Sequence, residues 1–319
     1  MWLQFTLLIV GFAILIVGAD FLVNGSSSIA KKFGISNLAI GLTVVAFGTS
    51  APELLVSITS SIKGYNDAAF GNIIGSNNFN LLFILGIAGL IYPLVVQRNT
   101  VKYEVPLSLL AAGVLFILVN DQLLWSSDSN TLSRFDSIIL LVFFALFLLY
   151  IYRTMTNTSD LDESPIKIYK THIAILMAIG GLVGLVFGAD LVVNNAVFIA
   201  KSYGLSEKLI GLTILAAGTS LPELATSCVA AYKRNTDIAI GNVIGSNIFN
   251  IFFILGITGL IRPLPYATAM NFDIYVLLGS TIVLMIFMFT LNTRKLDRWE
   301  AFMMLGGYFA YAIYLVGME

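Results

Sequence analysis

The chain carries the same pattern twice, 170 residues apart. GLTVVAFGTS at 41–50 returns as GLTILAAGTS at 211–220, and each copy is followed one residue later by a Pro-Glu pair. GNIIGSNNFN at 71–80 returns as GNVIGSNIFN at 241–250. The constant offset predicts a duplicated unit, so the fold of the first half should be repeated by the second.

Composition predicts that this unit lies in a membrane. Of the 319 residues, 58% are hydrophobic and 11% charged, and a soluble domain could not bury so much apolar surface. The net charge of −1 gives no field to recruit nucleic acid. Single Cys228 and His172 residues exclude disulfides, thiolate clusters and histidine-rich metal sites. We expect the lipid bilayer as surroundings, with no cofactor and no obligate protein partner.

Ten apolar runs are bounded by charges or turn residues, and most exceed the ~20 residues that cross a bilayer. The first is too long for a cleavable signal peptide and lacks its basic flank, so we expect it to span the membrane. The prediction is an all-α membrane protein with ten transmembrane helices. The runs are 2–30, 37–62, 67–91, 104–120, 135–153, 172–200, 207–232, 237–261, 272–291 and 299–317.

A polar segment divides these runs into two groups of five. The predicted domains are a five-helix repeat at 1–153, a cytoplasmic linker at 154–170 and a second five-helix repeat at 171–319. Because each half has an odd number of spans, the second half must enter the membrane upside down relative to the first. The sequence therefore predicts an inverted-topology repeat.

Basic residues support the inversion independently of the motifs. If the side that holds Lys31 and Lys32 is inside, twelve of the 17 basic residues lie inside and the other five lie outside. Equivalent positions such as Lys31 and Lys201 then fall on opposite sides. The positive-inside rule predicts a multi-pass protein of the plasma (inner) membrane with both termini outside.

Four acids lie within the predicted spans, where a charge costs at least ~2.5 kcal/mol. They form two repeat pairs, Asp20 with Asp190 and Glu53 with Glu223. No lysine or arginine in the same predicted helices can neutralise either glutamate, so a bound cation is the simplest counter-charge. Each aspartate is followed four residues later by an asparagine, and both a hydrogen bond between helices and a role near an ion path stay open for it.

The residues around each glutamate suit a hard cation. The proline in GTSAPE (48–53) and GTSLPE (218–223) removes the helical donor of the carbonyl four residues earlier, and we expect Gly48 and Gly218 to let the chain unwind there. Freed carbonyls at membrane depth persist only where they line a cavity or bind something. Carboxylate, carbonyl and hydroxyl oxygens are the ligands that Ca²⁺ and Na⁺ prefer.

The second duplicated block adds further oxygen atoms. Ser76 and Asn80 are four residues apart and share a helical face, and Ser246 and Asn250 match them. A lone serine or asparagine in a membrane helix usually bonds a neighbouring helix. Duplication of the acids favours an ion site instead, because packing alone requires no acid.

The paired GTS-x-PE and GSN-x-FN motifs resemble the α-repeats of the cation/Ca²⁺ exchanger superfamily and are most similar to its sodium/calcium exchanger branch and prokaryotic members. The likeness covers nearly the whole chain. It implies that Glu53 and Glu223 are the central Ca²⁺ ligands, shared with Na⁺, and that the first and sixth helices form a long, sliding pair. The further oxygen ligands it implies come from Thr49, Thr219, Ser50, Ser220, Ser76, Ser246, Asn80, Asn250 and the carbonyls of Ala46 and Ala216.

The chain departs from some relatives in ways that bear on its ions. Potassium-dependent sodium/calcium exchangers resemble this pattern but carry aspartate where this chain has Asn250, as do some prokaryotic exchangers. Neutral Asn80 and Asn250 argue against potassium co-transport. Proton-coupled Ca²⁺ exchangers look different around the glutamates. No large domain interrupts the linker, so Ca²⁺-sensing regulation is not expected.

The predicted function is secondary active antiport of Na⁺ and Ca²⁺ by alternating access at a mid-membrane site, and not enzymatic. Protons could replace Na⁺ as the driver, because a desolvated glutamate can titrate near neutrality, and another divalent ion such as Mn²⁺ could replace Ca²⁺. A channel and an intramembrane hydrolase are further alternatives. The spans hold neither an HExxH motif nor a Ser-Lys pair, which disfavours the hydrolase.

Overall fold

The computed structural model describes residues 2–125, 129–155, 167–203, 216–290 and 294–317. Its first half contains α1 (Trp2–Phe33), α2 (Asn37–Ile40), η1 (Gly41–Val45), α3 (Ala46–Thr49), α4 (Ala51–Lys63), α5 (Asn66–Asn78), η2 (Phe79–Ile84), α6 (Leu85–Ile91), β1 (Leu94–Val95), η3 (Thr100–Glu104), α7 (Val105–Val119), α8 (Asp121–Trp125), β2 (Thr131–Leu132) and α9 (Arg134–Thr154). Its second half contains α10 (Thr171–Ser202), α12 (Ala216–Gly218), α13 (Leu221–Tyr232), α14 (Thr236–Ile248), η5 (Phe249–Leu255), α15 (Gly256–Ile261), β3 (Leu264–Pro265), η6 (Thr268–Met270), α16 (Asn271–Phe287), β4 (Lys295–Leu296) and α17 (Arg298–Gly317).

The protein is an all-α membrane protein. Within the described residues, eight helices are long and apolar enough to cross a bilayer, and a ninth span results if the pair Asn37–Thr49 and Ala51–Lys63, bent by 46°, counts as one. The expected tenth span, 207–232, begins in a stretch outside the described residues, and its later part is α12 and α13. The described residues therefore contain eight or nine candidate spans, and the number ten stays a prediction.

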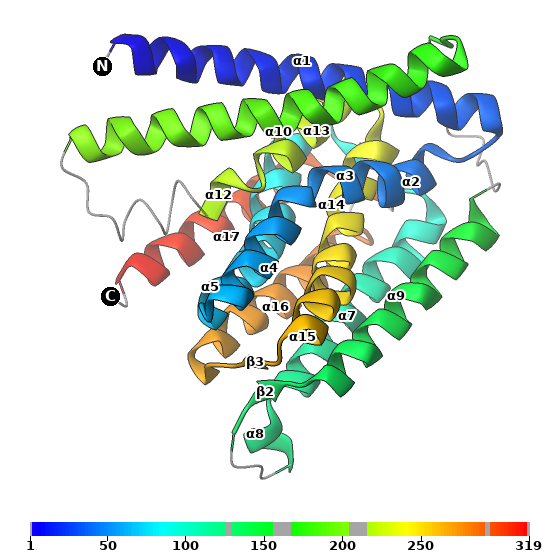
Figure 1. The fold of residues 1–319 in the computed structure, drawn as a ribbon. Helices are drawn as coiled ribbons and strands as arrows, with labels where there is room; N and C mark the ends of the chain where they lie inside the picture. Colours follow the sequence, from blue (N-terminus) through cyan, green and yellow to red (C-terminus); the bar gives the residue numbers. More distant parts are fainter. Residues whose placement is uncertain (1, 126–128, 156–166, 204–215, 291–293, 318–319) are drawn as a thin grey trace.

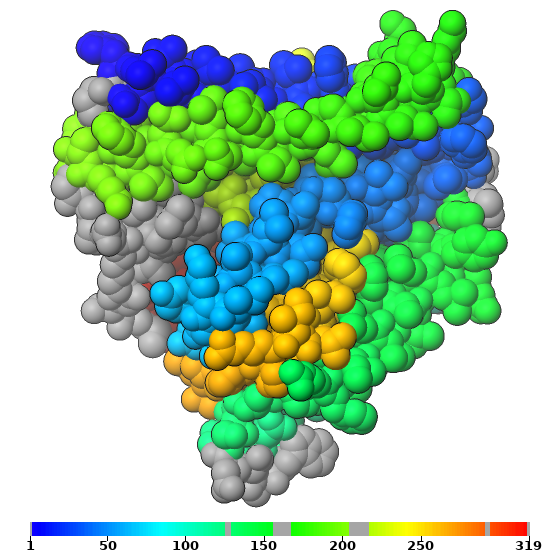
Figure 2. Space-filling model, viewed as in Figure 1, coloured from blue at the N-terminus to red at the C-terminus, as the bar shows by residue number. Residues whose placement is uncertain are grey.

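The two longest helices, α1 and α10, pack along each other in opposite directions (Figure 1). They hold repeat-equivalent residues. A Cβ atom added to Gly18 would lie 3.0 Å from the carbonyl oxygen of Gly181, and one added to Gly25 would lie 2.6 Å from that of Ala174. Such small residues let membrane helices approach closely. The space-filling view shows the pair lying along one edge of the molecule (Figure 2).

Two spans form the centre of the molecule. In the spans Asn66–Ile91 and Thr236–Ile261, 78% of the most apolar stretch is buried, against 39% or less in every other candidate span of the described part. These two spans carry the GSN-x-FN motifs. The glutamate-bearing helices α4 and α13 pack against them, so both duplicated blocks converge in the core.

Two features differ from a plain bundle of regular helices. Both central spans change to π-helical geometry, at Phe79 and at Phe249, and such segments often mark functional sites. Two short antiparallel strand pairs, β1 with β4 and β2 with β3, each join a loop of the first half to a loop of the second. The sequence did not predict either feature, since two-residue strands leave no alternating pattern.

Candidate ion-binding site

Each glutamate lies at the start of a helix that resumes after a break. The chain leaves helical geometry at Ser50 (φ −83°, ψ 7°) and at Ser220 (φ −89°, ψ 8°), and α4 and α13 begin at the next residue. Glu53 and Glu223 therefore fall in the first turn of α4 and α13, where free N–H groups and the helix dipole favour negative charge. The proline of each motif also lies in that turn, where its missing N–H breaks no helical bond.

The expectation that Gly48 and Gly218 unwind the chain is wrong in its location for the first copy. Helix α3 runs through Gly48 to Thr49, whereas α12 ends at Gly218. The glycines are needed for packing, because a Cβ atom would lie 2.4 Å from Leu182 at the first position and 2.5 Å from Val193 at the second. Both contacts come from α10, which passes over the two breaks.

The two glutamates meet in the core, and neither is exposed. The Ser50 hydroxyl donates to Glu223 Oε1 at 2.9 Å, and the Ser220 hydroxyl donates to Glu53 Oε1 at 3.0 Å. The serine of each motif thus binds the glutamate of the other half. This exchange places both carboxylates at one buried site between the halves.

The serines of the second motif complete the set around each carboxylate. Ser76 lies 3.5 Å from Glu53 Oε1, and Ser246 lies 3.4 Å from Glu223 Oε1. Both serines are buried. Each donates to the glutamate of its own half, so two hydroxyls, one from each half, approach the same carboxylate oxygen.

Asparagines join the two central spans across the site. Asn80 donates to Asn247 Oδ1 at 3.0 Å, and Asn250 donates to Asn77 Oδ1 at 2.9 Å. Asn77 and Asn247 also donate to each other's backbone carbonyls, at 3.2 and 3.3 Å. The contacts come in pairs that exchange the two halves, as a two-fold relation between the repeats requires.

Four buried oxygens at this site have no hydrogen-bond partner in the described structure. They are the second carboxylate oxygens of Glu53 and Glu223 and the amide oxygens of Asn80 and Asn250. Buried polar atoms are usually paired, so four unpaired acceptors in one repeat-related set need an explanation. In the described part, no three His, Cys, Asp or Glu residues cluster as a metal site, and the donor set is oxygen.

The remaining expected ligands lie beside the breaks. Thr49 donates to Asn242 Oδ1 at 3.0 Å, and Thr219 donates to Asn72 Oδ1 at 3.3 Å. The Ala46 carbonyl already accepts the Ser50 N–H at 3.0 Å and lies 3.3 Å from the Thr49 hydroxyl. Ala216 begins α12, and its side chain lies outside the described part.

Sequence reasoning missed four asparagines that shape the site. Asn72 donates to the Glu53 carbonyl and to the Ser57 hydroxyl. Asn242 makes the equivalent bonds to the Glu223 carbonyl and to the Ser227 hydroxyl. The other two are the cross-linking pair, Asn77 and Asn247. All four occur in the duplicated blocks at the offset of 170, and that position is the signal that could have found them.

The two aspartates singled out from the sequence do not join the glutamates. Asp20 pairs with Lys233 at the end of α13, and its repeat counterpart Asp190 is exposed. Glu104 and Asp273 are further acids within candidate spans that were not singled out from the sequence. Glu104 accepts the Tyr150 hydroxyl, and Asp273 accepts the Tyr311 hydroxyl at 2.6 Å.

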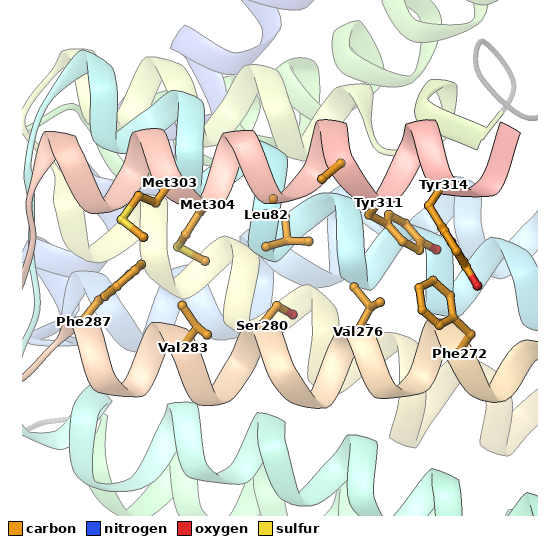
Figure 3. Close-up of a pocket in the computed structure, with 12 residues that line it drawn as sticks. Leu82, Phe272, Val276, Ser280, Val283, Phe287, Met303, Met304, Tyr311 and Tyr314 are labelled. Atoms are coloured by element: carbon orange, nitrogen blue, oxygen red, sulfur yellow. The ribbon is translucent and has the colours of Figure 1, made fainter. Parts of the chain in front are cut away.

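A groove of about 470 Å³ lies between α16 and α17, apart from the glutamates (Figure 3). Its lining is almost wholly apolar and includes Phe272, Val276, Met303 and Tyr314. Such a lining offers hydrocarbon contacts and few ligands for an ion.

A fold of paired helical repeats around buried carboxylates defines a membrane transporter of cations rather than an enzyme. Residues 3–153 and 173–317 match the family model of the sodium/calcium exchanger protein, and the chain belongs to that family. The resemblance noted from the motifs is thereby confirmed.

Relatives of this chain match over nearly its whole length. It is 38% identical over 314 residues to the putative antiporter CaxA of Alkalimonas amylolytica, covering 95% of this chain and 96% of that protein. It is 36% identical to the inner membrane protein YrbG of Escherichia coli, with 89% of each covered, and 31% identical to the sodium/calcium exchanger MaX1 of Methanosarcina acetivorans, with 98% of each covered.

Solved structures of the sodium-calcium exchanger NCX_Mj share the fold. One soaked with Na⁺ and Ca²⁺ matches with a TM-score of 0.79 and 34% identity, covering 97% of each chain. One soaked without either ion matches with a TM-score of 0.81 and 34% identity, covering 98% of this chain and 99% of that one. The chain is thus a multi-pass member of a cation/Ca²⁺ antiporter family.

Proposed function

We propose that this protein exchanges Na⁺ for Ca²⁺ across the membrane by alternating access. The observation that carries the proposal is the meeting of Glu53 and Glu223 at one buried site, where four acceptor oxygens have no partner in the part of the chain that the structure describes. Two buried carboxylates without a basic partner repel each other and are poorly solvated. A cation at this site would supply both the missing charge and the missing partners.

The proposed central ligands are the free oxygens of Glu53, Glu223, Asn80 and Asn250. The hydroxyls of Ser76 and Ser246 lie beside the carboxylates and would complete this set of ligands. Flanking Na⁺ sites would use Thr49, Thr219, Ser50 and Ser220 with the carbonyls of Ala46 and Ala216. An all-oxygen set of this kind suits Ca²⁺ and Na⁺.

Charge couples the two ions in this scheme. Two carboxylates neutralise one Ca²⁺ or two Na⁺, and a further Na⁺ on the flanking oxygens would make the cycle electrogenic. Because both ions need the same carboxylates, they compete. An empty site with two uncompensated charges is too costly to carry across the membrane, so only a loaded protein would change its access.

The two-fold pattern supports alternating access through inverted halves. Equivalent helices α1 and α10 run antiparallel, and the site contacts exchange the two repeats. In the proposed architecture, ten spans form five-helix repeats at 1–153 and 171–319, joined by a cytoplasmic linker at 154–170. Both termini would lie outside the plasma (inner) membrane. Related halves give inward and outward states of similar energy.

The relatives support the choice of ions. MaX1 is named a sodium/calcium exchanger, and NCX_Mj is described as exchanging ions at a site that becomes occluded, in crystals soaked with Na⁺, Ca²⁺ or Sr²⁺. Their match extends over almost the whole of this chain.

The test is ⁴⁵Ca²⁺ uptake into proteoliposomes with Na⁺, H⁺ and K⁺ gradients imposed separately. We expect an outward Na⁺ gradient alone to drive uptake. Glu53→Gln and Glu223→Gln should each abolish it, since either change halves the charge available to Ca²⁺. Asp67→Asn, which removes an exposed acid at the start of α5, is the control and should retain uptake. Flux driven by a pH gradient without Na⁺ would instead favour proton coupling, and flux that needs no counter-ion would favour a channel.

A further inference from the structure

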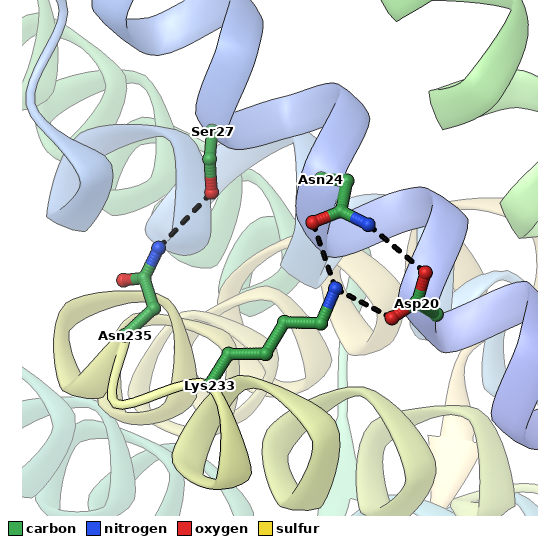
Figure 4. Close-up of polar contacts among 5 residues, drawn as sticks. All are labelled: Asp20, Asn24, Ser27, Lys233 and Asn235. Carbon is green, nitrogen blue, oxygen red and sulfur yellow. Dashed lines mark hydrogen bonds and ion pairs between the residues drawn. The ribbon is translucent and has the colours of Figure 1, made fainter. Parts of the chain in front are cut away.

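A polar cluster joins α1 to the end of α13, away from the glutamates (Figure 4). Lys233 Nζ lies 2.5 Å from Asp20 Oδ1 and donates to Asn24 Oδ1 at 2.7 Å. Asn24 donates in turn to Asp20 Oδ2 at 2.9 Å. One turn further along α1, Asn235 donates to Ser27 at 3.0 Å. Asp20, Asn24 and Ser27 therefore hold the loop after α13 against one face of α1.

A repeat-related set of the same three residue types, again drawn from both halves, is present but not assembled. Asp190, Asn194 and Lys63 stand 170 residues from Asp20, Asn24 and Lys233. All three are exposed, and none makes an ion pair or hydrogen bond with another described residue.

The surrounding helices show the same asymmetry. Helix α1 packs along α13, whereas α10 and α4, the equivalent pair, have no extended contact although both are described in full. Around the site, Asn242 is fully buried, while its counterpart Asn72 and the adjoining Thr219 are partly exposed. The structure is therefore closed at the assembled cluster and more open at the repeat-related place, where Asp190, Asn194 and Lys63 lie.

We propose that the assembled cluster of Asp20, Asn24 and Lys233 is a latch for one access state, and that Asp190, Asn194 and Lys63 form the matching latch of the other state. The inference rests on the proposed antiport by alternating access. In a protein with two-fold related halves, the conformational change exchanges the surroundings of equivalent residues. Assembly of one latch thus accompanies opening of the other. By the distribution of basic residues, Lys233 lies inside and Lys63 outside, so this structure is latched on the inside.

The two latches are not equal in strength. The Ser27–Asn235 bond of the assembled cluster has no counterpart, because position 197 is Val197, which has no polar side-chain atom, and position 65 is Tyr65. Ser27 and Asn235 are both buried, where a hydrogen bond is stronger than at the surface. The extra bond biases the resting protein toward the state seen here.

The test measures the distance between spin labels on the side that is now open. The labels replace exposed Ala68, at the start of α5, and exposed Tyr203, after α10, in a protein whose Cys228 is changed to alanine. Pulsed electron resonance then gives the ratio of long to short distances, which reports the open and closed states on that side. Purified protein in nanodiscs without Ca²⁺ is used, so the readout does not depend on transport.

Loss of a partly exposed ion pair shifts a two-state ratio by about two- to fivefold. Lys233→Gln should lower the ratio of long to short distances by that factor, and Lys63→Gln in the Lys233→Gln protein should return it toward the original value. Lys32→Gln, which removes an exposed lysine near the end of α1, is the matched control and should change nothing. The charge swap Asp20→Lys with Lys233→Asp should restore the original ratio.

The proposal is overturned if Lys233→Gln leaves the ratio equal to that of Lys32→Gln, or if Lys63→Gln shifts it in the same direction as Lys233→Gln. These results are separable from failure of the proposed function. A wild-type protein that moves no Ca²⁺ with a Na⁺ gradient refutes the antiport, whereas an unshifted ratio in a protein that does exchange the ions refutes only the latch.

Discussion

At the scale of single residues, the site is defined by what its polar atoms lack. Glu53 and Glu223 each use one carboxylate oxygen to accept serine hydroxyls, and the other oxygen has no partner among the described residues. A purely structural acid is usually satisfied on both oxygens or paired with a base. The duplicated unpaired oxygens therefore favour the proposed binding site over a packing motif.

The asparagine cross-link supports this arrangement and can be tested by truncation. Asn247→Ala removes the acceptor of Asn80 and the donor to the Asn77 carbonyl, and each buried group left unpaired costs about 1–3 kcal/mol. We expect a clear drop in the melting temperature of the detergent-purified protein, and Asn77→Ala should match it by symmetry. Asn194→Ala, at an exposed position, should melt like the original protein. Unchanged melting of both cross-link variants would refute the cross-link.

The glutamates, with Asn80 and Asn250, could be predicted from the sequence, whereas the roles of the other asparagines around them were missed. A repeated acid in an apolar run has few structural explanations, so Glu53 and Glu223 stand out. Asn72 and Asn77 are repeated just as strictly, but a membrane asparagine commonly bonds a neighbouring helix. The sequence does not show which of these amides turns toward the other half.

At the scale of helices, the apolar runs predict most ends to within a few residues. The run 135–153 corresponds to α9, Arg134–Thr154, and the run 172–200 to α10, Thr171–Ser202. The run 272–291 is longer than its helix, which ends at Phe287. The first half breaks its helix at Ser50 and not, as the sequence had suggested, at Gly48, and Gly48 instead allows close packing against Leu182. Composition alone cannot separate a glycine that bends a helix from one that admits a neighbour.

The packing of α1 on α10 gives a prediction with a control in the adjacent residue. A Cβ atom on Gly181 would lie 2.5 Å from the Leu22 nitrogen and 2.6 Å from the Gly18 carbonyl oxygen, so the backbones would have to separate. Such overpacking costs about 1–3 kcal/mol. Gly181→Ala should therefore lower the melting temperature in detergent. Gly180→Ala, whose Cβ atom would meet nothing within 4 Å, should not. Equal melting of the two variants would contradict the close contact.

At the scale of the whole molecule, two related halves build one buried carboxylate site between them, which is the proposed ion site. Neither half contains a complete set, because one of the two serines that donate to each glutamate comes from the other repeat. The duplication could be predicted from the constant offset of 170 residues, whereas the inversion stays a prediction from the charge distribution. Which of the two polar clusters is assembled could not be predicted, because Asp20 and Lys233 are repeated as Asp190 and Lys63 and only the structure distinguishes the two pairs.

The central claim is that one cation is shared by Glu53 and Glu223. Equilibrium ⁴⁵Ca²⁺ binding to the purified protein tests it most directly, with Na⁺ as competitor. The account predicts one Ca²⁺ per chain, displaced by Na⁺, and a loss of affinity of about 100-fold or more in both Glu53→Gln and Glu223→Gln, because each change removes half the charge of a desolvated site. Two Ca²⁺ per chain, or original affinity in either variant, would contradict it.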